Sequence, residues 1–115
     1  MTNEKKAAME RFVRLCTPLG PVRGKAMFGG YGVYCDDLMF ALITRQGEIF
    51  LKADGETRGS FDAVGLRQFG KMPYFQAPSD ALESWDALEP WATASLEAAR
   101  RTRKPRRATA RNASG

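Results

Sequence analysis

Few side chains in this sequence can do chemistry, and their types exclude most catalytic devices. The 115 residues contain two cysteines, 13 carboxylates and no histidine. Histidine is the commonest general base, the partner of nucleophilic serine and cysteine, and the usual zinc ligand. Its absence removes most hydrolase mechanisms, and the two cysteines and a pair of adjacent aspartates are the candidates to weigh.

The cysteines fit structural roles better than catalytic ones. Cys16 falls on the apolar stripe of a predicted helix, where core thiols are common. Cys35 ends a predicted strand beside Asp36, whose negative charge raises a thiol pKa and makes the nucleophilic thiolate scarcer. Asp36 and Asp37 could be paired carboxylates, but aspartates are typical of turns and adjacent strand residues point to opposite faces. We expect no catalytic residue and no metal site.

Two glycine-rich stretches match phosphate-binding loops poorly. The segment from Gly20 to Ala26 is one residue too short for a Walker A loop, and Ala26 stands where Ser or Thr would bind Mg²⁺. The segment 29–32 (Gly-Gly-Tyr-Gly) precedes a predicted strand, whereas a dinucleotide loop precedes a helix. We therefore expect no cofactor.

Glycines on one predicted strand leave open a docking role. Gly30 and Gly32 share a strand face with Phe28 and Tyr34, because alternate residues point the same way. Missing side chains allow another element to approach the sheet closely. Tight packing within the domain is the simpler interpretation. The alternative is a docking or dimerisation groove lined by Phe28 and Tyr34.

Aromatic and β-branched runs predict strands from Ala26 to Cys35, Leu38 to Thr44 and Glu48 to Ala53. Short turns between them favour an antiparallel meander. Phe69 and the stretch 72–77 predict one or two further short strands.

A 3–4 spacing of apolar residues predicts helices over residues 4–17 and 88–99. A shorter helix is predicted over 56–64, with Phe61 and Val64 pointing inward. The order is helix, three strands, helix, two strands, helix. Strands grouped in hairpins indicate an α+β fold of two layers, with helices packed on an antiparallel sheet of about five strands.

Charge divides the chain into a predicted domain, residues 1–100, and a predicted disordered tail, 101–115. Seven of the 18 cations follow Glu97, so the first 99 residues have a net charge of −2. The cations that could contact phosphates are Arg100, Arg101, Arg103, Lys104, Arg106, Arg107 and Arg111. No signal peptide or membrane span is recognisable, so we expect a cytoplasmic protein that does not bind membranes.

The octet 27–34 (Met-Phe-Gly-Gly-Tyr-Gly-Val-Tyr) resembles the signature of the TfoX N-terminal domain family, which is named for a regulator of bacterial competence. Segments 39–42 (Met-Phe-Ala-Leu) and 51–54 (Leu-Lys-Ala-Asp), together with Tyr74 and Trp91, resemble its later motifs. The resemblance covers about residues 8 to 100. It implies a secretion-chaperone-like α+β fold and no catalytic residues.

Function is therefore expected to lie in binding. The leading hypothesis is a regulatory module that contacts a partner protein or a second copy of itself. The alternative is a nucleic-acid-associated protein whose tail contacts phosphates without regard to sequence, since no aromatic residue interrupts the arginines.

Overall fold

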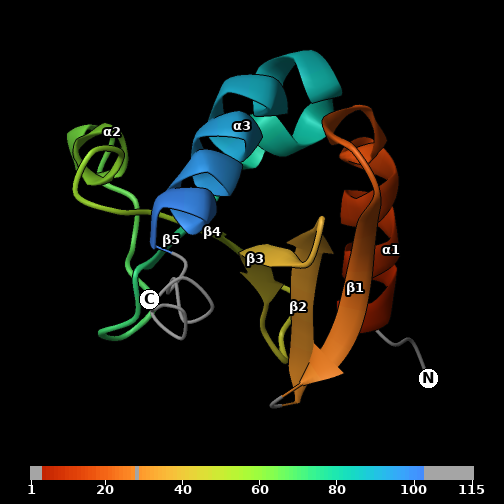
Figure 1. The fold of residues 1–115 in the computed structure, drawn as a ribbon. Helices are drawn as coiled ribbons and strands as arrows, with labels where there is room; N and C mark the ends of the chain where they lie inside the picture. The colour runs from red at the N-terminus through yellow and green to blue at the C-terminus, as the bar shows by residue number, and fades with distance from the viewer. Residues whose placement is uncertain (1–3, 28, 103–115) are drawn as a thin grey trace, which may run out of the picture.

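The computed structural model describes residues 4–27 and 29–102 and contains five strands, three α-helices and two short 3-10 helices (Figure 1). Phe28 and residues 103–115 lie outside the described part. The prediction that the tail is disordered therefore falls on residues that the structure does not describe. The helices are α1 (Glu4–Leu15), η1 (Thr17–Leu19), α2 (Arg58–Ala63), η2 (Ser79–Glu83) and α3 (Trp85–Thr102). The strands are β1 (Val22–Met27), β2 (Gly30–Cys35), β3 (Leu38–Ile43), β4 (Ile49–Lys52) and β5 (Tyr74–Gln76).

The strands form one sheet in the order β1-β2-β3-β4-β5, and every neighbouring pair is antiparallel. The predicted fold class and strand number are confirmed. Their distribution along the chain differs, because four strands precede α2 and one follows it. The predicted strand from Ala26 to Cys35 covers β2 but only the last two residues of β1, and the strand expected at Phe69 is only an isolated bridge between Gln68 and Phe75.

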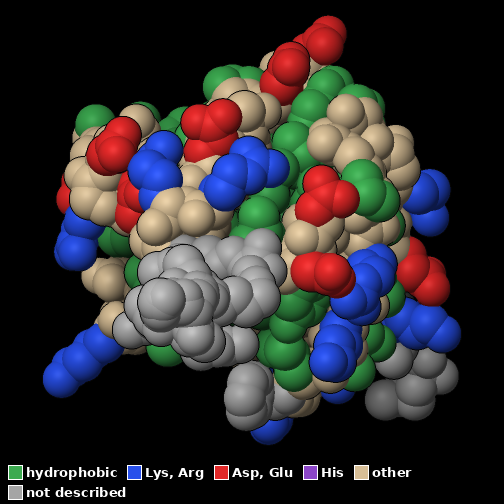
Figure 2. Space-filling view, in the orientation of Figure 1, with side chains coloured by type: hydrophobic (Ala, Val, Ile, Leu, Met, Phe, Trp, Pro, Cys, Tyr) green, Lys and Arg blue, Asp and Glu red, His purple; other side chains and the backbone are tan. Residues whose placement is uncertain are grey.

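The helices α1 and α3 pack on the same face of the sheet. Contacts join α1 mainly to β1 and β2, and α3 to β3 and β4. Between these two layers lies the core, where Phe12 packs on Phe40 with ring centroids 6.0 Å apart. Figure 2 shows a band of hydrophobic side chains through the middle of the molecule, with charged side chains on both sides.

Side chains alternate between the two faces of each strand. In β2, Val33 and Cys35 enter the core under the helices, whereas Gly30, Gly32 and Tyr34 belong to the opposite face. We call this second face the open face, because neither α1 nor α3 packs on it among the described residues.

Two helix predictions need correction. Phe61 is buried as expected, but Val64 follows α2 and is 59% exposed. The helix α3 begins at Trp85 and continues through Thr102, so the predicted boundary after residue 100 lies inside it. Within the described part of the chain, no helix has the length and apolar character needed to cross a membrane.

Candidate functional site

The cysteines and the paired aspartates, which the sequence disfavours as catalytic residues, have structural positions in the fold. Burial, and secondarily the neighbouring Cys35, raises the pKa of the Cys16 thiol to about 12. Burial and the charge of Asp36 raise the pKa of Cys35, while Arg100 acts in the opposite direction. Because the thiolate is the nucleophile, these raised pKa values and the burial of both side chains disfavour a nucleophilic role.

Asp36 and Asp37 form the turn between β2 and β3. Their φ angles of 52° and 65° are both positive, which is typical of the two central residues of a tight hairpin turn. Asp37 lies 3.2 Å from the guanidinium of Arg23 in an exposed ion pair. Among the residues that the structure describes, no group of three or more His, Cys, Asp or Glu side chains could hold a metal ion.

Gly30 and Gly32 have packing reasons to be glycine. A Cβ atom at Gly30 would overlap the carbonyl oxygen of Ile43 on β3, which is backbone and cannot rotate away. A Cβ atom at Gly32 would lie 2.7 Å from the sulfur of Met39, a flexible side chain. Tyr34 lies beyond them on the same face, with the guanidinium of Arg23 5.3 Å from its ring centroid. A docking role for these residues stays a prediction.

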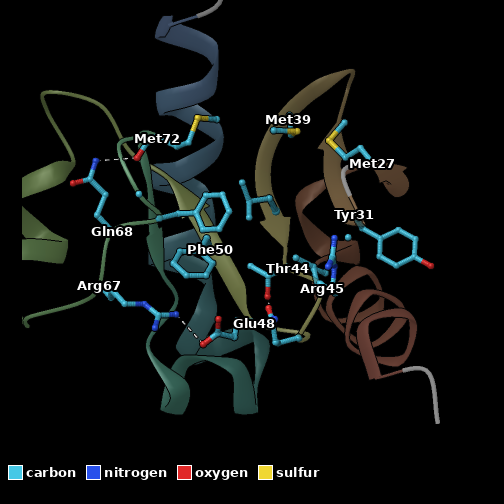
Figure 3. A pocket seen from close by; sticks show the side chains of 16 residues that line it. Met27, Tyr31, Met39, Thr44, Arg45, Glu48, Phe50, Arg67, Gln68 and Met72 are labelled. Atoms are coloured by element: carbon cyan, nitrogen blue, oxygen red, sulfur yellow. Dashed lines mark hydrogen bonds and ion pairs between the residues drawn. The ribbon is translucent and has the colours of Figure 1, made fainter. Parts of the chain in front are cut away.

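An apolar groove of about 580 Å³ crosses the open face next to these residues (Figure 3). Of the predicted surface residues that the structure describes, Gly30, Gly32 and Tyr34, only Gly30 lines it. Its apolar lining comes chiefly from other positions: Met27, Met39, Leu42, Phe50, Phe69 and Met72. The nearly continuous hydrophobicity of β3 is the signal that could have revealed the groove. Because side chains alternate between the two faces of a strand, an unbroken apolar run places some apolar residues on the face away from the core.

One wall of the groove is the segment between α2 and β5. Backbone hydrogen bonds from Phe69 N to Tyr74 O and from Gln76 N to Arg67 O, each 2.8 Å long, hold this segment against β5. The ring of Phe69 packs 5.1 Å from that of Phe50, yet Phe69 remains 38% exposed and Met72 47% exposed. This wall therefore presents apolar side chains to solvent while its backbone is paired.

Cations lie around the groove and over its aromatic rings. The guanidinium of Arg67 is 5.4 Å from the ring centroid of Phe50 and donates a 2.8 Å hydrogen bond to Glu48 (Figure 3). Further along the open face, the Lys52 ammonium lies 5.2 Å from the ring centroid of Tyr74. Burial raises the pKa of Tyr74 to about 12 and lowers that of Lys52, so the phenol stays neutral.

Two of the predicted tail cations lie in the folded part. Arg100 and Arg101 belong to the last turn of α3. Arg101 donates two hydrogen bonds to the carboxylate of Asp54, whereas Arg100 is exposed. The other predicted phosphate contacts, Arg103, Lys104, Arg106, Arg107 and Arg111, lie outside the described residues.

The sheet, its helix layer and the groove define a two-layer α+β domain with an apolar surface on the open face. The chain belongs to the TfoX N-terminal domain family, whose model matches residues 14–99. It is also 35% identical over 60 residues to the DNA transformation protein TfoX1 of Aliivibrio fischeri (strain ATCC 700601 / ES114). That match covers 52% of this chain and 28% of the relative, so the chain spans only about a quarter of the relative's length.

Proposed function

We propose that this domain is a non-enzymatic regulatory module that acts by contact with a partner protein. The observation that carries the proposal is the groove of about 580 Å³ on the open face, with Phe69 and Met72 exposed along its wall. Exposed apolar patches rimmed by polar residues mark protein interaction sites or ligand-binding grooves. The burial of both thiols and their raised pKa values support binding over catalysis.

We propose that the domain regulates bacterial competence, which is the uptake of DNA. We propose that it acts in the cytoplasm. Membership in the TfoX N-terminal domain family and the name of the Aliivibrio fischeri relative support this proposal. Fold and family do not by themselves transfer function, so the role must be tested in the cell.

Photo-crosslinking in living cells tests protein contact. A photoreactive phenylalanine analogue at Phe69 should give a discrete adduct with another protein. The same analogue at Val64, which is also exposed but outside the groove, should not. Adducts at neither position, or equally at both, would contradict the proposal.

Transformation frequency tests the regulated process. We expect deletion of the gene in its native host to change the number of transformants obtained with added DNA. The exposed-residue variant Met72→Asp should reproduce the deletion, and Val64→Asp should behave as the wild type. An unchanged frequency after deletion would refute the competence role while leaving protein contact intact.

The alternative proposal is nucleic-acid association through the tail. It depends on the cations beyond α3, whose charge would neutralise phosphates without reading sequence. A second copy of the chain is the other proposed partner, and the crosslinking experiment would reveal it as an adduct of twice the domain's mass.

A further inference from the structure

We propose that the groove binds an apolar segment of a partner protein that is flanked by acidic residues. This inference rests on the proposed function and adds the chemistry of the partner.

The lining of the groove is suited to apolar side chains of varied shape. Met27 and Met39 come from β1 and β3, and Met72 from the opposite wall (Figure 3). Methionine is unbranched and polarizable, so it adapts to irregular apolar partners. Phe50 forms the buried centre, only 1% exposed, and gives the groove a fixed floor.

The charges around the groove are mostly positive. Arg45 and Arg67 line it, and Lys25 lies on the same face of β1, opposite Gly32. Glu48 also lines it and accepts a hydrogen bond from Arg67, so these two charges offset each other and Arg45 and Lys25 supply the net positive charge. Complementary charge at an interface raises the association rate and selects partners, so acidic flanks suit this rim.

The aromatic rings argue against a single-stranded nucleic acid as the occupant. Base stacking needs an accessible ring face. Phe50, the ring at the centre of the groove, is 1% exposed and Arg67 lies over it. Phe69 is 38% exposed but packs against Phe50, with ring centroids 5.1 Å apart, and Tyr31 lies on the opposite side of the groove, so no row of neighbouring open rings is available for successive bases. The accessible apolar surface combines methionine thioethers with the exposed part of Phe69, which suits apolar side chains.

A second copy of the chain is also disfavoured. A symmetric dimer formed through the open face would bring like patches together. The same rim, with Arg45 and Lys25 on each copy, would then lie on both sides of the interface, and repulsion between two rims of like charge is unfavourable.

Binding of designed peptides to the full chain tests the inference. Three peptides of equal length share one apolar core of leucine and phenylalanine and differ in their flanks, which are glutamate, lysine or serine. Affinity is measured by fluorescence anisotropy, and the site by NMR of ¹³C-methyl-labelled methionines. Met9 is the internal control, because it packs on the helix side of the sheet against Gly24.

We expect the glutamate-flanked peptide to bind at least about tenfold more tightly than the lysine-flanked one, with the difference shrinking as salt is added. The methyl signals of Met27, Met39 and Met72 should shift and that of Met9 should not. Met72→Asp should weaken binding at least about tenfold, whereas Val64→Asp should not change it. Arg45→Glu should reduce the preference for acidic flanks, and Arg14→Glu on α1 should preserve it.

Three results would overturn the inference. The first is equal affinity for all flanks, or shifts confined to Met9. The second is that a single-stranded oligonucleotide shifts the three groove methyls more strongly than the glutamate-flanked peptide. The third is that these methyls shift with the concentration of the free protein, which would indicate a second copy. A crosslink at Phe69 to another protein together with any of these results would leave the proposed function standing and refute only the partner's chemistry.

Discussion

The carboxylate of Asp54 and the guanidinium of Arg101 form a two-point ion pair that joins the end of α3 to the segment after β4. Arg101 Nε lies 2.6 Å from Oδ2 of Asp54, and Nη2 lies 3.1 Å from Oδ1. Oδ1 also accepts hydrogen bonds from the backbone amides of Glu56 and Thr57. The Asp54 side chain is 9% exposed, so this pair is better shielded from water than the other ion pairs of the described residues.

Asp54→Asn should destabilise the domain. The amide keeps an oxygen for the turn amides but loses the charge that holds Arg101, and a partly buried hydrogen bond to a charged group contributes about 1 to 2 kcal/mol. Urea unfolding measures the loss. Arg100→Gln, one residue from Arg101 and exposed, is the control and should have little effect. Equal stability of the Asn variant and the wild type would contradict the role of the pair.

The same pair makes stability depend on acid pH. The hydrogen bonds from Arg101 hold the pKa of Asp54 at about 2, below its ordinary 3.8. A lowered pKa in the folded state means that the stabilisation is complete above the unfolded value and is lost as pH falls through the folded value. The stability difference between wild type and Asp54→Asn should therefore be constant above about pH 5 and shrink towards pH 2. A difference that does not change over this range would refute the assignment.

Gly30→Ala should destabilise the domain by more than about 1 kcal/mol, because the added Cβ overlaps the carbonyl of Ile43 and β2 and β3 must separate. Gly59→Ala is the matched control. Gly59 lies within α2, and a Cβ there meets nothing within 4 Å. Alanine is a better helix former than glycine, so this change should preserve or raise stability. Thermal unfolding of both variants checks the prediction, and the opposite order would contradict it.

The sequence predicted the fold class and most elements, and the errors have physical causes. The helix stripes and the strands β3 and β4 are periodic and apolar, so local pattern was enough. The strand β1 is polar and exposed at the sheet edge, with Gly24 at its centre, and only its pairing with β2 makes it a strand. Pairing between segments is not visible in local composition.

The groove was missed for a related reason. Phe50 and Met39 are ordinary apolar strand residues in the sequence, and the nearly continuous apolar pattern of their strands does not show which face each one takes. Whether such residues face the helices or the open face depends on the register between strands. The irregularity in the pairing of β2 with β3, between Val33 and Tyr34, shifts that register at one point.

The two thiols should react slowly with iodoacetamide in the native protein. Cys16 and Cys35 are 0% and 1% exposed, and burial raises the pKa of both. We expect labelling at pH 8 to be at least about a hundredfold slower than in urea. The reagent has little access to the buried sulfur atoms, and the raised pKa values leave only a small fraction of thiolate. Mass spectrometry of the labelled chain measures the two rates. Rapid native labelling of Cys35 would show a reactive thiol and reopen a catalytic role.

Truncation after Thr102 should leave stability unchanged, whereas truncation after Ala99 should lower it. The shorter chain loses Arg101, which pairs with Asp54, and Thr102, whose hydroxyl donates a 2.8 Å hydrogen bond to the carbonyl of Ala98. Circular dichroism during heating compares the two chains. Equal melting temperatures would show that the last turn of α3 contributes nothing.

The truncation after Thr102 therefore provides the proper test of nucleic-acid binding by residues 103–115. This segment has five cations, at Arg103, Lys104, Arg106, Arg107 and Arg111. If all of them contact phosphates, the logarithm of the affinity for duplex DNA should fall with the logarithm of salt concentration with a slope of about −4.5. The truncated chain should lose most of this dependence, and changing the DNA sequence should alter neither slope.

A chain with the five cations changed to glutamine is the matched control and should behave as the truncation does. Equal binding by all three chains would refute the tail's role, because the folded part has a small net charge and its Arg101 is held by Asp54.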